Sequence, residues 1–200
     1  MKITKYTHSC VKIEHPGGVL VIDPGVWSEP RAVDGADAVL VTHEHSDHID
    51  VRRLSTLGIP VYMPAGARVQ DLEVVPVHPG EVFTAGGMEI EAVGGRHAPT
   101  YATRPDCVNV GYIVDHRCYH PGDSLHVPQR DVDILLTPVH GSWMKTAEAI
   151  DYAKYTRSRH VVAIHEGQIN QRGLSSVDEW FTQEIGNRYQ RLEPGEFLSL

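Results

Sequence analysis

The segment that most constrains the fold is His43-Glu44-His45-Ser46-Asp47-His48, which is separated only by Thr42 from the apolar run at residues 38–41. Three imidazoles and two carboxylates therefore lie within six residues, at the end of a short buried strand. A polar helix start with Ser46 or Asp47 as its N-cap explains some of these residue types. It does not explain three histidines, whereas half of a metal site does. The remaining ligands must then come from distant segments of the chain.

The order of apolar runs and turn signals predicts a single domain over residues 1–200. Residues 11–14 and 19–22 flank a His-Pro-Gly-Gly turn and are expected to form a β-hairpin. Helices are expected over residues 49–57, 146–156 and 174–185, the first ending at Gly58. Further strands are expected over residues 37–41, 61–63, 81–83, 88–92, 108–114, 117–119, 132–137, 160–164 and 197–198. This mixture favours an α/β (α+β) fold with two packed sheets and helices outside, rather than one doubly wound parallel sheet.

Composition and charge narrow the class of partner. The formal net charge is −8 and Lys and Arg form no run, which argues against a nucleic-acid-binding surface. No apolar stretch is long enough to span a membrane, and the segment after Met1 lacks the apolar core of a signal peptide, so we expect a cytoplasmic protein. The 3 scattered cysteines suggest neither a disulfide framework nor a zinc knuckle. The expected partner is a small-molecule substrate, and the sequence leaves homo-oligomer formation open.

Side-chain alternation indicates how the histidine-rich motif divides between two ions. In an extended chain His43, His45 and Asp47 point the same way. His48 falls on the other side as the chain turns into the expected helix. This arrangement allows His43 and His45 to hold one metal while Asp47 and His48 hold a second. Imidazole and carboxylate ligands suit Zn²⁺ and also Mn²⁺ or Fe²⁺.

Further candidate ligands occur where other strands are expected to end. His97, Asp123 and His165 each lie within two residues of a glycine at such a position. Glycine lets a backbone approach closely, and loops on a rigid scaffold commonly build sites. Alone, these residues have ordinary explanations as a loop histidine, a turn residue and a core histidine. Their shared placement favours the role of ligand.

Together these residues make the sequence resemble the metallo-β-lactamase superfamily. HEHSDH matches the HxHxDH signature, and His97, the Gly-Asp-Ser around Asp123 and His165 follow in that superfamily's order. The opening HSCVKIE…GGVLVIDPG also resembles the ascorbate-6-phosphate lactonase-like, metal-dependent hydrolase branch. The resemblance covers nearly the whole chain and implies a four-layer αββα sandwich with a dinuclear site at one sheet edge. The implied ligand sets are His43, His45 and His97 for one ion, Asp47, His48 and His165 for the other, and Asp123 as the bridge.

The implied chemistry is hydrolysis. Metal ions lower the pKa of bound water toward about 7, so hydroxide is available at neutral pH without a separate strong base. Asp47 is the expected catalytic residue, which orients this nucleophile or shuttles its proton. The local positive charge of such a centre favours a small anionic or polarised substrate, for example a lactone, a phosphodiester or a thioester.

The substrate pocket is expected to form beside this centre. The loop over residues 139–145 follows a buried strand, as the ligand-bearing loops do. We expect His140 and Trp143 to shape the pocket, with His8 close by, after a first strand expected at the start of the chain. Lys145 or Arg96 is expected to pair with a substrate anion.

Two other classes of function remain open. A mononuclear iron dioxygenase acting on sulfur would keep the same HxHxDH motif, and one iron per chain with oxygen uptake would identify it. A non-catalytic metal-binding module is the third class, although no ligand position has been lost.

Overall fold

The computed structural model describes residues 1–103 and 107–200, and two mixed sheets form its centre. In spatial order the first sheet contains β14 (Phe197–Ser199), β1 (Lys2–Lys5), β2 (Val11–His15), β3 (Gly18–Ile22), β4 (Ala38–Leu40), β5 (Val61–Pro64) and β6 (Val75–Val77). The second contains β13 (Tyr189–Gln190), β12 (His160–Ile164), β11 (Ile134–Pro138), β10 (Cys118–His120), β9 (Val110–Val114), β8 (Met88–Gly94) and β7 (Val82–Ala85). In each sheet three pairings are antiparallel and three are parallel.

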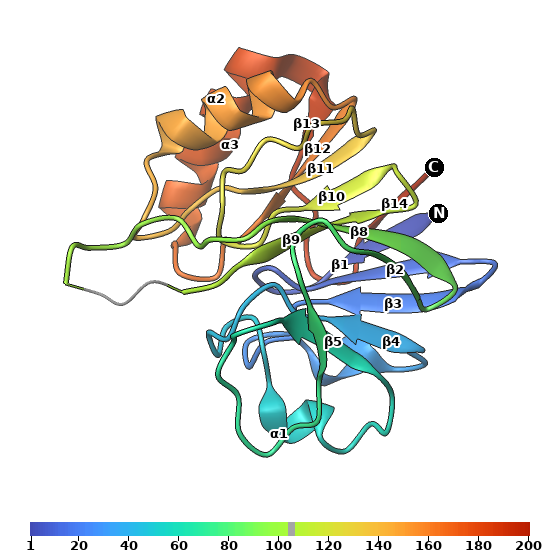
Figure 1. Cartoon of the computed structure of the whole chain (residues 1–200). Coiled ribbons are helices and arrows are strands. Elements are labelled where there is room, and N and C mark those ends of the chain that lie inside the picture. The colour runs from blue at the N-terminus through green and yellow to red at the C-terminus, as the bar shows by residue number, and fades with distance from the viewer. Residues whose placement is uncertain (104–106) are drawn as a thin grey trace.

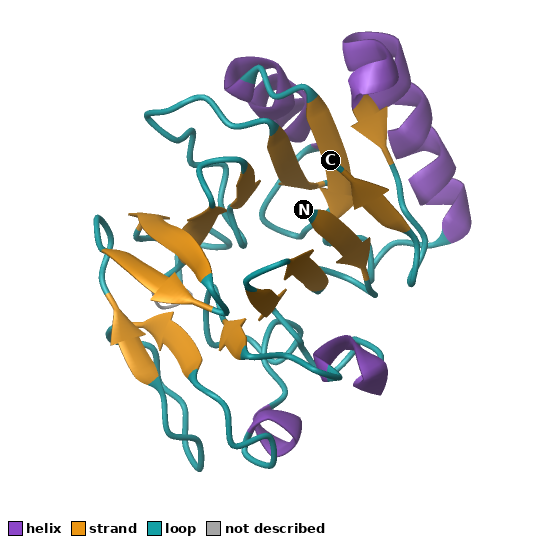
Figure 2. Cartoon of the chain, turned by 90° about the vertical axis from the view of Figure 1, so that its right-hand side faces the viewer, coloured by secondary structure: helices purple, strands orange, loops and turns teal. Residues whose placement is uncertain are grey.

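Helices cover the outer faces of both sheets. α2 (Thr146–Thr156) and α3 (Gln171–Ile185) lie outside the second sheet, and the short α1 (Val51–Leu54) lies outside the first (Figures 1 and 2). Two 3-10 helices, Pro30–Val33 and Gly186–Arg188, are also present. The layers are therefore helix, sheet, sheet and helix, which confirms the αββα sandwich. No helix within residues 1–103 and 107–200 is long and apolar enough to cross a membrane.

Strand alternation explains why three apolar clusters form. Leu20 and Ile22 of β3 belong to the cluster between the two sheets, whereas Val21 belongs to the cluster that includes Leu54 of α1. In the same way Leu136 of β11 lies between the sheets, while Leu135 packs in the cluster under α2 and α3. Successive strand residues point to opposite faces, so strands covered on both sides are apolar throughout.

The predicted hairpin, α2 and β12 agree with the structure, whereas other boundaries differ. The helix predicted over residues 49–57 is regular only over Val51–Leu54. Beyond Leu54 the chain makes tighter turns, with Leu57 N donating to Leu54 O (3.1 Å). α3 begins three residues earlier than predicted, because the Asn170 side chain accepts a hydrogen bond from Gly173 N and caps the helix at that point. The short strands β6 and β13 were not predicted.

Candidate metal centre

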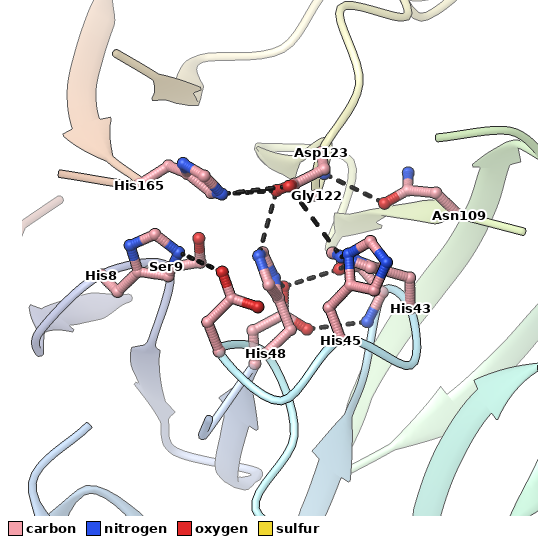
Figure 3. Close-up of polar contacts among 12 residues, drawn as sticks. His8, Ser9, His43, His45, His48, Asn109, Gly122, Asp123 and His165 are labelled. Carbon is pink, nitrogen blue, oxygen red and sulfur yellow. Dashed lines mark hydrogen bonds and ion pairs between the residues drawn. The ribbon is translucent and has the colours of Figure 1, made fainter. Parts of the chain in front are cut away.

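Strands of both sheets carry the candidate ligands to one edge of the sandwich. The pairings give β1, β3 and β4 a common direction, and likewise β8, β10, β11 and β12. The loop after each of these strands contributes a polar residue, and Figure 3 shows side chains from both sheets pointing toward one another. In chain order these residues are His8, Asp23, His43, His97, Asp123, His140 and His165.

The first group of candidate ligands contains His43, His45, His97 and Asp123, whose donor atoms all lie within 4.8 Å of one another. His43 Nε2 is 3.0 Å from His45 Nδ1. His97 Nε2 is 3.3 Å from Asp123 Oδ2. These are the three histidines that the resemblance assigns to one ion, together with the proposed bridge.

The second group contains His8, Asp47, His48 and His165, whose donor atoms also lie within 4.8 Å of one another. Asp123 borders this group as well, because its Oδ1 is 3.0 Å from His48 Nε2 and 3.0 Å from His165 Nε2. The carboxylate of Asp123 therefore contacts both groups (Figure 3). The structure thus brings together all seven residues that were predicted as ligands.

Hydrogen bonds at the far side of three imidazoles determine which nitrogen faces the centre. The Nδ1 of His48 donates to Asp23 Oδ2 (2.7 Å), that of His97 donates to the Ala98 carbonyl (2.6 Å), and that of His165 donates to the His140 carbonyl. Carbonyl and carboxylate oxygens only accept, and a neutral imidazole has one N–H. The Nε2 lone pairs of these rings are therefore directed at the carboxylate of Asp123.

Burial opposes protonation of His48, but the nearby Asp123 and Asp23 raise its pKa well above the usual value, so this position favours a positive charge. Where the rings are neutral, their lone pairs and the carboxylate need a cation between them. The Nε2 atoms of His48 and His97 and Oδ1 of Asp123 are buried without a hydrogen-bond partner. Buried polar atoms are normally satisfied, so such orphaned atoms need an explanation. A divalent cation accepts nitrogen and oxygen lone pairs together. The donor set therefore fits the metal that the sequence predicts.

Asp23 orients one imidazole in each group, although it was not among the predicted site residues. Its buried carboxylate accepts hydrogen bonds from Thr42 N (2.7 Å), Thr42 Oγ1 (2.7 Å) and His48 Nδ1 (2.7 Å). Because the Thr42 hydroxyl donates its proton to Asp23, its oxygen accepts from His43 Nδ1 at 3.0 Å. Carboxylates behind ligating histidines fix the tautomer and the ring direction. The available signal was an acidic residue directly at the end of the apolar β3.

His8 has the opposite tautomer. Gly167 N donates to His8 Nδ1 (3.1 Å), so His8 Nε2 carries the proton and donates to Asp47 Oδ2 (3.1 Å). The His8 backbone is held as well, because its N–H donates to Glu166 Oε1 at 2.9 Å. His8 therefore presents a donor to the Asp47 carboxylate and offers no lone pair toward the second group.

Burial and neighbouring groups shift the pKa values of these residues. Burial lowers the pKa of His8 to about 4, although Asp47 opposes the shift. Burial would raise the pKa of Asp47, but the His8 hydrogen bond and nearby imidazoles outweigh it and lower this pKa to about 2. Burial likewise opposes ionisation of Asp123, but His48 and His165 hold its pKa well below the usual range. Both carboxylates are therefore ionised at neutral pH.

Three residues of the centre have strained backbones. His8, Asp23 and His165 have φ angles of 67°, 51° and 63°, in the left-handed region. Such conformations cost about 1–3 kcal/mol each and persist where the surroundings enforce them, commonly at functional sites. Here they let the chain turn sharply at the strand end and direct each side chain into the centre.

The glycine before Asp123 is explained by close packing. Gly122 has a φ of +64°, and a Cβ atom would lie 2.3 Å from Asn109 Oδ1 and 2.7 Å from Thr42 Oγ1. Asn109 Oδ1 also accepts from Asp123 N at 3.0 Å. The turn thus positions the main chain of Asp123 through Asn109.

Gly122→Ala is expected to lower the free energy of unfolding by about 2–4 kcal/mol, from the left-handed backbone and the overpacking combined. Urea unfolding in the presence of a chelator measures this loss apart from any effect of bound metal. Gly58→Ala is the matched control, because Gly58 has a φ of +65° but no atom within 4 Å of the added Cβ. It should lose only about 1–2 kcal/mol. Equal losses would show that the contact with Asn109 is unimportant.

A pocket of about 530 Å³ opens beside the first group. His97 and Trp143 line this pocket together with Pro99, Leu125 and His126. Arg96 and Glu148 supply the charged part of the lining. The carboxylate of Glu148 accepts a hydrogen bond from the backbone N of Lys145 (2.7 Å). The wall therefore contains both apolar and charged side chains.

The three residues predicted to bind substrate have different positions. Trp143 lines the pocket, and its Nε1 donates to Asp123 Oδ2 at 3.0 Å. The carbonyl of His140 accepts from His165, and the side chain of His140 is not part of the pocket lining. His8 is fully buried against Asp47. Of the two predicted bases, Arg96 lines the pocket and Lys145 does not.

An αββα sandwich with imidazoles and carboxylates at its edge has the architecture of a metal-dependent hydrolase. The family described as "Beta-lactamase superfamily domain" matches residues 2–165, and the chain belongs to the metallo-β-lactamase superfamily. This confirms the family that the HxHxDH motif indicates.

Relatives agree with this assignment. Protein Rv0786c of Mycobacterium tuberculosis is 36% identical over 180 residues, which cover 83% of this chain and 84% of that protein. A UPF0173 metal-dependent hydrolase of Nitratidesulfovibrio vulgaris is 28% identical and covers 100% of this chain and 95% of its own length. Among solved structures, the metallo hydrolase Igni18 of Ignicoccus hospitalis has a TM-score of 0.74 at 20% identity, covering 98% of this chain and 97% of that chain. The protein is a metal-dependent hydrolase of the metallo-β-lactamase fold.

Proposed function

We propose that the protein hydrolyses a small anionic or polarised substrate at a centre of two divalent ions. The observation that carries this proposal is the carboxylate of Asp123, which contacts two separate groups of imidazoles. Asp123 would bridge the two ions. The other ligands would be His43, His45 and His97 on one side, and Asp47, His48 and His165 on the other. Nitrogen and oxygen donors suit zinc best, with manganese or iron as alternatives.

The residues around the centre have separable roles in this hydrolysis. When bound, the ions would polarise the scissile group and lower the pKa of water toward about 7. Asp47 would orient the water by accepting its hydrogen bond, because it is ionised and partly accessible, with 16% of its side chain exposed. His8 would hold one oxygen of Asp47 through its Nε2–H. Asp23 and the carbonyls of Ala98 and His140 would keep the ligand rings in the required tautomers.

The pocket supports a small substrate rather than a polymer. Its volume of about 530 Å³ suits a single compact molecule. Pro99, Leu125 and Trp143 would contact an apolar part of the substrate, and Arg96 would pair with an anionic part. A lactone, a phosphodiester or a thioester that carries both an apolar part and an anionic group would fit these contacts. The net charge of −8 disfavours approach by a polyanion.

Arg96→Met is expected to raise the KM for an anionic substrate about 10-fold, because a hydrogen bond to a charged group contributes about 1.5–3 kcal/mol. The kcat should change little, since Arg96 holds neither the ions nor the attacking water in this proposal. Lys145→Met is the matched control, because it removes the same charge outside the pocket lining. Steady-state kinetics on paired anionic and neutral esters measures the effect. Equal KM changes in both variants would remove Arg96 from substrate recognition.

Metal content and a substrate screen test the proposed function directly. Two ions per chain by mass spectrometry, with hydrolysis in a screen of phosphodiesters, lactones and thioesters, would support it. One iron per chain with oxygen uptake would replace it by the sulfur dioxygenase function. Metal binding without turnover of any substrate would indicate a binding module.

A further inference from the structure

Trp143 occupies a position between the substrate pocket and both ligand groups. It lies in the loop between β11 and α2 and is half-buried. Its ring is edge-on to His97 of the first group and to His165 of the second, with centroid distances of 5.8 Å and 5.8 Å. Trp143 also lines the pocket.

The loop is built to bring the indole close to the centre. A Cβ atom at Gly141 would lie 2.8 Å from Trp143 Nε1, so only glycine permits the ring to fold back over this residue. Met144 N donates to Gly141 O at 3.1 Å and closes the turn. In this position Trp143 Nε1 donates to Asp123 Oδ2 at 3.0 Å.

This hydrogen bond differs from the other contacts of Asp123. The rings of His48, His97 and His165 use their Nδ1–H elsewhere and direct lone pairs at the carboxylate. An indole N–H is a donor only and does not ionise, so it cannot compete for a cation. Among residues 1–103 and 107–200, Trp143 is therefore the side-chain donor that the carboxylate keeps when these imidazoles are neutral.

We propose that Trp143 is a positioning residue for Asp123 as well as a wall of the pocket. Its indole N–H holds one carboxylate oxygen and so orients Asp123 to face both ligand groups. A substrate that packs against the ring of Trp143 therefore contacts the same side chain that orients Asp123. This inference rests on the proposed function, because it assigns Asp123 to the bridge between the ions.

Trp143→Phe separates the two roles, since it keeps an aromatic wall and removes the donor. Titration of the chelator-treated protein with Co²⁺ alone measures affinity, and the visible absorption of bound Co²⁺ reports the surroundings of the ions. We expect about 10-fold weaker binding and an altered spectrum, within the range for groups that orient metal ligands. Trp180→Phe is the matched control, because Trp180 is exposed on α3. It should change neither quantity.

Unchanged affinity and spectrum in Trp143→Phe would overturn the inference while leaving the proposed function intact. A wild-type protein that binds no Co²⁺ would overturn both. If the wild type binds one ion, the two-ion proposal fails, and the role of Trp143 in orienting a bridging carboxylate fails with it.

A second measurement needs no change at Trp143. The ¹⁵N–¹H indole resonance of Trp143 can be assigned in the wild type by eliminating Trp27 and Trp180 with Trp27→Phe and Trp180→Phe. We expect slow hydrogen exchange for this resonance and a shift when Zn²⁺ is added. A rapidly exchanging signal that does not respond to Zn²⁺ would show that the indole does not hold Asp123.

Discussion

Asp123→Asn is expected to lower turnover by about 100-fold or more and to weaken binding of the second ion. The amide keeps the shape of the side chain but removes the negative charge that faces both ligand groups. Two divalent ions without a shared carboxylate have less charge compensation. Substitution of residues that only hydrogen-bond to metal ligands commonly lowers metal affinity or activity about 10–100-fold, and loss of a ligand should lower them at least as much. Turnover on the best substrate from the screen and metal content by mass spectrometry measure the two effects.

The control for this substitution is Asp131→Asn, which removes the same charge from an exposed position. It should retain full activity and metal content. Wild-type turnover in Asp123→Asn would mean that Asp123 does not bridge. The circular dichroism spectrum of the variant shows whether it is folded. Loss of turnover in a folded Asp123→Asn protein supports the bridge.

His97→Ala is expected to lower metal content and melting temperature together. Ligands that bind only the native state stabilise it by about 2.7 kcal/mol at 100 times the dissociation constant. For a chain of this size that stabilisation corresponds to a melting temperature about 5–10 °C higher. Chelation of the wild type should produce a similar decrease, because either change removes the contribution of the bound ion. Differential scanning calorimetry with and without a chelator measures both decreases.

His78→Ala is the matched control, because His78 is an exposed loop histidine outside both groups. It should melt as the wild type does and respond fully to chelation. Full metal content in His97→Ala would exclude His97 from the centre. A decrease in melting temperature that persists equally under chelation would assign His97 a packing role instead.

Local sequence patterns were sufficient to predict the strands that carry the ligands. The apolar runs of β4, β11 and β12 are buried on both faces, which makes the signal strong. α2 was predicted with its observed bounds because its buried residues, Ala149, Ile150 and Ala153, repeat at helical spacing. Grouping the seven candidate ligands depended on the family resemblance, because no local pattern relates residue 43 to residue 165.

Other features could not be predicted because they depend on which loops meet. The tautomer of His8 is set by Gly167, which is 159 residues distant in the sequence. The contact between Trp143 and Asp123 joins two loops of the second sheet, and its sequence signal, Gly141, is an ordinary turn residue. The edge strand β6 escaped prediction because it contains Pro76, which is tolerated at a sheet edge but weakens a strand signal.

The division of the ligands between the two sheets has a consequence for how the protein comes apart. The loop over residues 43–48 belongs to the first sheet, whereas His97, Asp123 and His165 follow strands of the second. Ions held at this edge would therefore fasten the two halves of the sandwich across their shared apolar interface. For the two sheets to separate, the side chains of one sheet would have to release the ions before the apolar surfaces between the sheets became exposed to water. Coordination at this edge would thus raise the kinetic barrier to unfolding, in addition to its role in chemistry.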